Sequence, residues 1–343
     1  MLQAVLSVPQ TRREAAVASW LYTCCVAIFL MVVIGGITRL TESGLSIAEW
    51  KPLIGALPPL TQAEWDRVFD LYRQTSEYRL VNAGMSLAEF KTIFWWEYIH
   101  RLWGRLLGLV FFVPLVWFAW RGALDRRLGL KLLGIFALGG LQGAIGWWMV
   151  ASGLVDRTDV SQYRLATHLG VAFLIYALIL WVALDLTERP RPAAAPALRR
   201  FGWLLLGCIA VTVVAGAFVA GTKAGLVYNS FPLMGGQILP PDYLALRPGW
   251  RNVFENPAAI QFNHRLLAIG TLLLAGVFAW RARGDRAAAG PAALLFAATA
   301  AQATLGIATL LLVVPLTLGV LHQAGALALL TVAVWTAHRL RGA

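Results

Sequence analysis

The sequence predicts an all-α membrane protein with eight transmembrane helices, arranged as two parallel-repeat four-helix bundles. Of the 343 residues, 59% are hydrophobic and only 13% are charged, whereas charged residues make up roughly a quarter of soluble domains. The hydrophobic residues gather in long runs, and the motifs of the first half return in the same order in the second half. These observations exclude an ordinary soluble enzyme.

Each hydrophobic run is close to the length of about 20 residues that crosses the hydrocarbon core of a bilayer. The predicted spans are 16–38, 94–120, 129–151, 163–185, 201–221, 258–280, 291–314 and 316–337. The start of the chain has neither a transit segment rich in Arg and Ser nor a cleavage site of small residues, so we expect the first span to remain as an anchor.

The net charge of +12 could indicate a nucleic-acid partner, but it follows the order of the spans instead. Lys and Arg clearly exceed Asp and Glu at the span ends that share a side with Arg12 and Arg13, and the other side is nearly balanced. The positive-inside rule then predicts a multi-pass protein of the inner or plasma membrane with both termini in the cytoplasm. We expect the lipid bilayer, and no nucleic acid, as its surroundings.

The two halves share four motifs in the same order. VVIGGITRLTESGLS after the first span resembles VVAGAFVAGTKAGLV after the fifth, and EYIHRL resembles QFNHRL. A Gln and a Gly four residues apart recur at Gln142 and Gln302, and a His recurs at His168 and His322. Each half has an even number of spans, so an axis along the membrane normal should relate them.

The repeat also predicts the domain boundaries. Residues 1–187 form an N-terminal bundle, 188–200 form a cytoplasmic linker rich in Pro, Ala and Arg, and 201–343 form a C-terminal bundle. The outer connections 40–93 and 222–257 are long, and long loops usually have a function. Within the first, residues 61–74 show the spacing of an amphipathic helix lying over the outer mouth.

Four of the five histidines lie on even-numbered spans: His100, His168, His264 and His322. Each follows the outer start of its span closely, so all four should form one layer about 8–12 Å below the outer boundary. A single intramembrane histidine can be a packing residue, but four at one depth indicate function, because ionisable groups in lipid are costly. We expect His338, near the inner end, to be a solvated interfacial residue.

A haem fits this layer better than zinc does. Zinc needs further ligands at the same level, and the three cysteines, Cys24, Cys25 and Cys208, lie in spans as apparent packing residues. A haem needs one or two axial imidazoles and a flat apolar slot. Each half is therefore predicted to hold a haem between two histidines.

Cations and small residues accompany the histidines. Arg101, Arg105 and Arg265 are candidates for binding haem propionates, although arginines at this depth also extend to lipid phosphates. The glycine pairs at 35–36 and 139–140 could admit a macrocycle or simply allow close helix packing.

The halves differ at one place that matters for chemistry. Glu97 lies three residues before His100, on nearly the same helix face, whereas Gln261 lies three residues before His264. A carboxylate beside one haem can take a proton, position water or stabilise a cation. Its alternative role is to stabilise the N-terminal end of its helix. We predict a catalytic first bundle and an electron-transferring second bundle.

From about residue 16 to 338 the chain resembles the haem A synthase family, in the form found in proteobacteria and mitochondria. The motifs that carry the resemblance are GGITRLTESGLSIAEWKPLIGALPP, EYIHR, NHR, ATH and LHQ. The resemblance implies an enzyme that oxidises the C8 methyl of haem O to a formyl group, through an alcohol and a geminal diol, giving haem A for terminal oxidases.

The resemblance also implies roles for individual residues. His100 and His168 would flank the substrate or product haem, His264 and His322 would ligate the iron of a haem b that relays electrons, and Glu97 would be the catalytic acid. All four histidines are thus candidate metal ligands. Implied partners are haem O synthase (protohaem farnesyltransferase), oxidase assembly factors, an electron acceptor that the sequence does not identify, and a second copy of the chain.

The sequence departs from the family pattern at one point, and two other functions remain as alternatives. Some family members carry a cysteine pair in an outer loop, and this sequence has none there. The main alternative is a diheme b-type membrane cytochrome in quinone electron transfer, but its haems would lie toward opposite faces. A transporter or haem carrier would be expected to show inverted repeats and broken helices.

Overall fold

The computed structural model describes residues 12–49, 57–154, 158–188 and 191–342. The predicted start of the chain at 1–11, part of the long outer segment at 50–56 and residues 189–190 of the predicted linker lie outside the described residues. Within the described ranges, the only extended pairing is one isolated bridge between Met234 and Gln237. The all-α prediction is confirmed.

Eight long helices correspond to the eight predicted spans. They are α1 (Arg12–Leu40), α4 (Leu87–Trp120), α5 (Arg126–Ala151), α6 (Gln162–Thr187), α7 (Pro196–Gly221), α9 (Pro257–Ala282), α10 (Ala289–Leu311) and α11 (Leu316–Leu340). Each is long and apolar enough to cross a membrane. α4 begins well before the predicted 94, because a capping box between Ser86 and Glu89 starts the helix in a polar segment that hydropathy does not detect.

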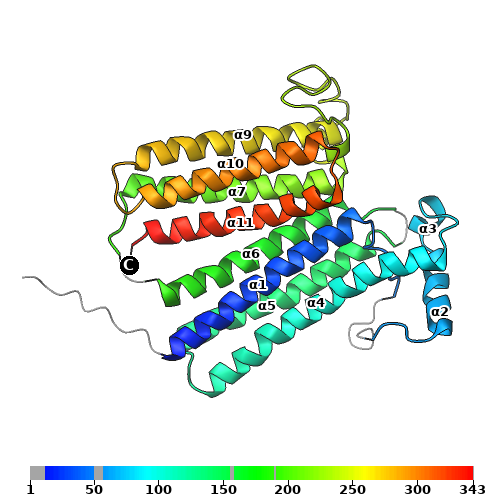
Figure 1. Ribbon diagram of the computed structural model, residues 1–343, viewed down its shortest axis with the longest axis horizontal. Coiled ribbons are helices and arrows are strands. Elements are labelled where there is room, and N and C mark those ends of the chain that lie inside the picture. Colours follow the sequence, from blue (N-terminus) through cyan, green and yellow to red (C-terminus); the bar gives the residue numbers. More distant parts are fainter. Residues whose placement is uncertain (1–11, 50–56, 155–157, 189–190, 343) are drawn as a thin grey trace, which may run out of the picture.

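The long helices form two groups of four that run side by side (Figure 1). α1 packs against α4 and α6, and α5 packs against the same two helices; α7 and α10 pack in the same way against α9 and α11. The groups meet where α6 contacts α7 and where α11 contacts α1 and α6. The exact domain boundaries at 188–200 stay a prediction, but the helix order agrees with a parallel repeat.

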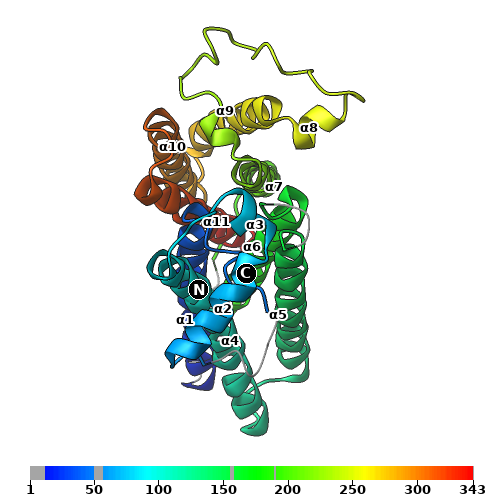
Figure 2. The same ribbon diagram turned by 90° about the vertical axis from the view of Figure 1, so that its right-hand side faces the viewer.

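Both described ends of the chain lie at one end of the molecule, and two short helices lie at the other (Figure 1). We call the end with the short helices the outer end. They are α2 (Gln62–Arg73) and α3 (Ser76–Leu80), and they lie in front of the first group when the molecule is viewed from that end (Figure 2).

The predicted amphipathic helix at 61–74 is confirmed as α2. Its apolar side chains Trp65, Phe69 and Tyr72 recur at helical spacing and are buried. They pack against Phe90 and Phe94 of the outer part of α4. We call α2, α3 and this part of α4 the outer layer.

The second long connection contains η2 (Ala224–Leu226) and α8 (Arg251–Glu255). Asn252 holds the loop before α8, since its side chain accepts from the backbone N–H of Leu246 at 2.9 Å and donates to the carbonyl of the same residue at 2.9 Å. This local pairing holds the loop against the start of α8.

The prediction that His338 is solvated was wrong. Its side chain is only 5% exposed, and its Nε2 lies 3.0 Å from Oδ1 of Asp185 on α6. The ring also meets the indole of Trp181 edge to face, with centroids 5.0 Å apart. The inner ends of α6 and α11 pack together, and this contact covers a residue that the sequence alone places at a boundary.

Candidate functional site

The four histidines of the predicted layer lie on four different helices, two in each group. His100 of α4 and His168 of α6 are close enough to interact electrostatically, and the same holds for His264 of α9 and His322 of α11. The structure therefore brings together the two histidines of each predicted pair. What each pair binds stays a prediction at this point.

Four glycines of the neighbouring helices lie against these imidazole rings. A methyl group added to Gly146 would lie 2.9 Å from Cε1 of His168, and one added to Gly306 would lie 2.8 Å from Cε1 of His322. A methyl group on Gly35 would be 3.2 Å from Nε2 of His100. Gly216 takes the corresponding place beside His264, at 3.1 Å from Cε1. Side chains larger than hydrogen would displace the rings.

These contacts separate the two glycine pairs that the sequence singled out. Gly35 lies beside a histidine, and Gly36 lies beside Gln323 of the other group. A methyl group added to Gly139 or Gly140 would meet no atom of another described helix within 4 Å. The pair at 139–140 therefore does not serve the packing of described helices.

Two glutamines orient one histidine of each pair. Gln142 Nε2 donates to the carbonyl of His168 at 2.9 Å and lies 3.1 Å from Nδ1 of the same residue. Gln302 makes the same two contacts with His322, at 2.8 and 3.1 Å. Sequence reasoning noted these glutamines only as repeat markers. Their spacing to Gly146 and Gly306 could have revealed them, since residues four apart share one helix face.

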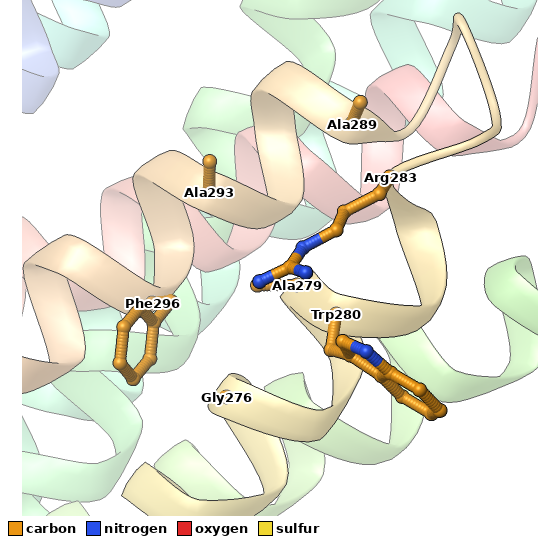
Figure 3. A pocket seen from close by; sticks show the side chains of 7 residues that line it. All are labelled: Gly276, Ala279, Trp280, Arg283, Ala289, Ala293 and Phe296. Carbon is orange, nitrogen blue, oxygen red and sulfur yellow. The ribbon is translucent and has the colours of Figure 1, made fainter.

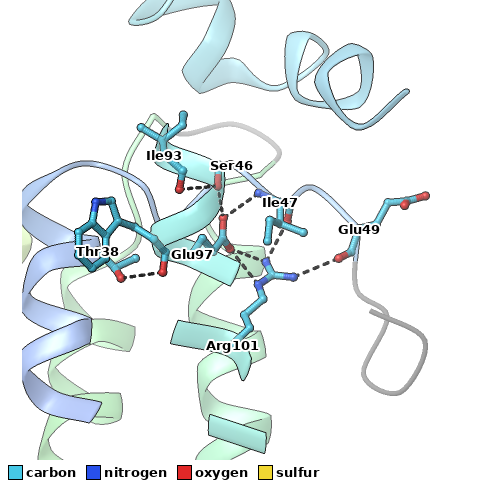
Figure 4. A network of polar contacts seen from close by, with 8 residues as sticks. Thr38, Ser46, Ile47, Glu49, Ile93, Glu97 and Arg101 are labelled. Atoms are coloured by element: carbon cyan, nitrogen blue, oxygen red, sulfur yellow. Dashed lines mark hydrogen bonds and ion pairs between the residues drawn. The ribbon is translucent and has the colours of Figure 1, made fainter. Parts of the chain in front are cut away.

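Glu97 is buried at the outer end of the first group, with only 2% of its surface exposed. Its Oε2 accepts hydrogen bonds from the Ser46 hydroxyl and the Ile47 N–H, both at 2.7 Å. Its Oε1 accepts from Arg101, at 3.0 Å from Nε and 2.5 Å from Nη2 (Figure 4). The carboxylate is thus held by donors from two segments and cannot rotate freely.

Arg101 ties the same site to the chain that follows α1. Its Nη2 donates to the carbonyl of Ile47 at 2.9 Å, and its Nη1 donates to the carbonyl of Glu49 at 3.1 Å (Figure 4). All three guanidinium nitrogens therefore have acceptors inside the protein. The predicted role of Arg101 toward a propionate stays a prediction.

The second group repeats this arrangement with an amide in place of the acid. Arg265 donates to the carbonyls of Tyr228 and Ser230 at 2.8 and 2.9 Å, the places equivalent to Ile47 and Glu49 in the repeated motifs. Its Nη2 also donates to Oε1 of Gln261 at 3.1 Å. We call each arginine with its two loop carbonyls an arginine clamp. The two clamps match, but Arg101 also binds the acid Glu97, whereas Arg265 binds the neutral amide of Gln261.

Arg105, the third predicted propionate cation, lies one helical turn beyond Arg101 toward the inner end of α4. It is partly buried. Its predicted role stays a prediction.

A surface groove of about 410 Å³ lies away from this layer. It is bounded by α9 and α10 near the loop that joins them, and its lining includes Trp280, Arg283 and Phe296 (Figure 3). That loop is at the inner end of α9, whereas His264 is near the outer end. Among the described residues, no three His, Cys, Asp or Glu side chains gather as ligands for a metal ion.

Comparison with known proteins finds matches along nearly the whole chain. Residues 18–334 match the family model COX15-CtaA, described as cytochrome oxidase assembly protein. Relatives called haem A synthase are 54% identical in Nitrosospira multiformis, covering 96% of this chain and 94% of the relative, and 56% identical in Rhodospirillum centenum, covering 95% and 88%. A third, from Parvibaculum lavamentivorans, is 53% identical over 95% of this chain and 94% of its own length. The chain therefore belongs to the COX15-CtaA family of cytochrome oxidase assembly proteins.

Proposed function

We propose that the protein is a haem A synthase, an oxidoreductase that converts the C8 methyl of haem O to the formyl group of haem A. The names of its relatives support the reaction class. The observation that carries the proposal is the difference between Glu97 and Gln261 on two otherwise matching arginine clamps. One group has an anchored acid beside its histidine pair, and the other has a neutral amide.

His264 and His322 would hold a haem b, and His100 and His168 would flank the substrate haem. The glycines beside all four rings support this arrangement, because a side chain at any of them would press on the imidazole that is proposed as a ligand. Bound haem b would supply reversible one-electron chemistry and relay electrons to an acceptor. Haem O and haem A would be substrate and product in the first group.

Glu97 would act at the substrate. Ser46, the Ile47 N–H and Arg101 fix its carboxylate before any ligand arrives, which is the preorganisation that electrostatic catalysis requires. A fixed negative charge stabilises positive charge that develops on a substituent during oxidation. A carboxylate in this place also directs the protons that the oxidation releases.

The proposal includes a membrane location and neighbouring proteins. By the distribution of Lys and Arg, the chain would lie in the inner or plasma membrane with its histidine layer near the outer face. Haem O synthase and oxidase assembly factors are the proposed neighbours, because they supply the substrate and use the product. A diheme cytochrome of quinone electron transfer is less well supported, because all four histidines lie toward the same end of the molecule.

The test is the identity of the haems. The protein would be expressed with a source of haem O, purified, and its extracted haems separated by chromatography. Haem O or haem A together with haem b is the expected result. A preparation that contains haem b alone and never yields haem A would overturn the proposal in favour of the cytochrome.

A further inference from the structure

Glu77 of α3 is a buried acid outside the histidine layer. Only 4% of its surface is exposed, and its Oε2 has no hydrogen-bond partner within the part of the chain that the structure describes. Burying a carboxylate with an unsatisfied oxygen is costly. Glu77 lies in a polar connection where most positions are solvated. Because a buried position costs free energy there, we expect a function that requires the burial.

Glu77 has a hydrogen-bonding tyrosine beside it and lies within electrostatic range of other acids, Glu97 among them. Tyr72 of α2 is its hydrogen-bonding neighbour, and the Tyr72 hydroxyl accepts from Asn82 Nδ2 at 2.7 Å. Three acids act on Glu77 electrostatically: Glu97 of α4, Glu42 after α1, and Asp159 before α6.

Each of these three acids forms an ion pair, whereas Glu77 forms none within the described part of the chain. Arg101 pairs with Glu97, and Lys223 pairs with both Glu42 and Asp159. In the described ranges, no Lys, Arg or His forms an ion pair with Glu77. Among these four acids, Glu77 is therefore the one whose ionised form is least stabilised.

This environment changes the protonation of Glu77. Burial, followed by the repulsion of the three neighbouring acids, raises the pKa of its carboxyl to about 8, and the Tyr72 hydrogen bond opposes the increase. The ordinary glutamate pKa is about 4.3. Glu77 can therefore gain and lose a proton near neutral pH, as a proton-transfer group must.

We propose that Glu77 is a proton relay of the outer layer, which takes up protons released beside Glu97 and passes them to the outer aqueous phase. The inference rests on the proposed function, because oxidation of a methyl to a formyl group releases protons as well as electrons. The proton binds a carboxylate oxygen of Glu77 and leaves to water. No electron passes through Glu77, since the electrons go to the acceptor of the oxidation.

The test compares pH profiles of haem A formation. The wild-type rate should rise with pH toward about 8, where Glu77 becomes ionised and able to accept. Glu77→Gln keeps the size and an acceptor for Tyr72, and we expect it to lower the rate at neutral pH by about tenfold and to flatten the rise. Tyr72→Phe removes a bond that lowers the pKa, so the rise should move to higher pH.

Asp70→Asn is the matched control, since Asp70 is an exposed acid of α2 that pairs with Arg73 and should leave rate and profile unchanged. Infrared difference spectra of the purified protein give a second measurement that needs no turnover. A carboxylic acid band that titrates near pH 8 and disappears in Glu77→Gln is expected, and its absence overturns the relay.

The haem spectrum of each variant serves as the folding control. If Glu77→Gln lost its haem, two other measurements would test the relay. They are the pH shift of the rate profile in Tyr72→Phe and the infrared band of the wild-type protein. If the wild-type protein forms haem A and Glu77→Gln forms it at the same rate with the same pH profile, the relay is overturned and the proposed function stands. Wild-type protein that forms no haem A would overturn the proposed function and the relay with it.

Discussion

Lys223 Nζ lies 2.6 Å from Oε1 of Glu42, although the two residues occupy equivalent places in the repeated motifs. Both have a left-handed backbone with φ of 53°, so the loops after α1 and α7 turn in the same way. Lys223 also lies 3.1 Å from Oδ2 of Asp159. Opposite charges at one repeated position thus join the two helix groups at their outer ends.

Lys223→Ala should destabilise the protein more than Glu42→Ala does, because Lys223 has two acidic partners. Both side chains are about two-fifths exposed, and exposed ion pairs contribute at most about 1 kcal/mol. Thermal unfolding of the detergent-solubilised protein measures the difference. A loss several times larger, or the reverse order of the two variants, would contradict this account of the contact.

Glu97→Gln should preserve the fold and both haems but lower haem A formation by at least about 100-fold. The fold should survive because Gln261 and Arg265 already form the corresponding clamp with an amide. Chromatography of extracted haems gives the yield, and the visible spectrum reports haem content. Gln261→Glu is the mirror-image control and should not impair haem A formation comparably. Unchanged haem A yield in Glu97→Gln would remove the proposed role of the acid.

Gly306→Ala should add about 1–3 kcal/mol of packing strain and so reduce haem b content, because the new methyl group would press on the His322 ring. Gly146→Ala should disturb the first group in the same way through His168. Gly134→Ala and Gly290→Ala are the controls, since an added methyl group meets no neighbouring atom of the described residues there and neither glycine belongs to the proposed haem sites. Haem content per protein, measured after purification, separates the two classes. Equal losses in all four variants would mean that the ring contacts are not responsible.

His264→Ala and His322→Ala should each abolish the stable b-type spectrum, whereas His100→Ala should retain much of it. The reason is that His264 and His322 interact within one helix group and His100 belongs to the other. Optical spectra of the reduced protein provide the measurement. Loss of the whole spectrum in His100→Ala would reject the proposed division between substrate haem and haem b.

The eight long helices could be predicted because the bilayer demands about 20 apolar residues in a row, which is a strong pattern. The repeat, the histidine pairs and α2 were visible as well, since each leaves a regular spacing. The short helices α3 and α8 were not predicted. Five residues such as those of α3 do not form a helix on their own; caps and tertiary packing hold them.

The contacts of individual polar side chains could not be predicted from the sequence either. Arg101 and Arg265 were assigned to propionates, but both donate to loop carbonyls that lie far away along the chain. The burial of Glu77 could not be predicted, because most of its neighbours in the sequence are polar. Such contacts depend on how loops fold back over helices, and hydrophobic periodicity carries no information about that.

The matching clamps around Glu97 and Gln261 have an evolutionary consequence. Codons for glutamate and glutamine differ at one base, so a single nucleotide substitution in a duplicated gene converts one kind of clamp into the other. The surrounding framework, with its arginine and its two loop carbonyls, needs no change. A new catalytic activity could therefore arise in one copy while the other copy kept its original task.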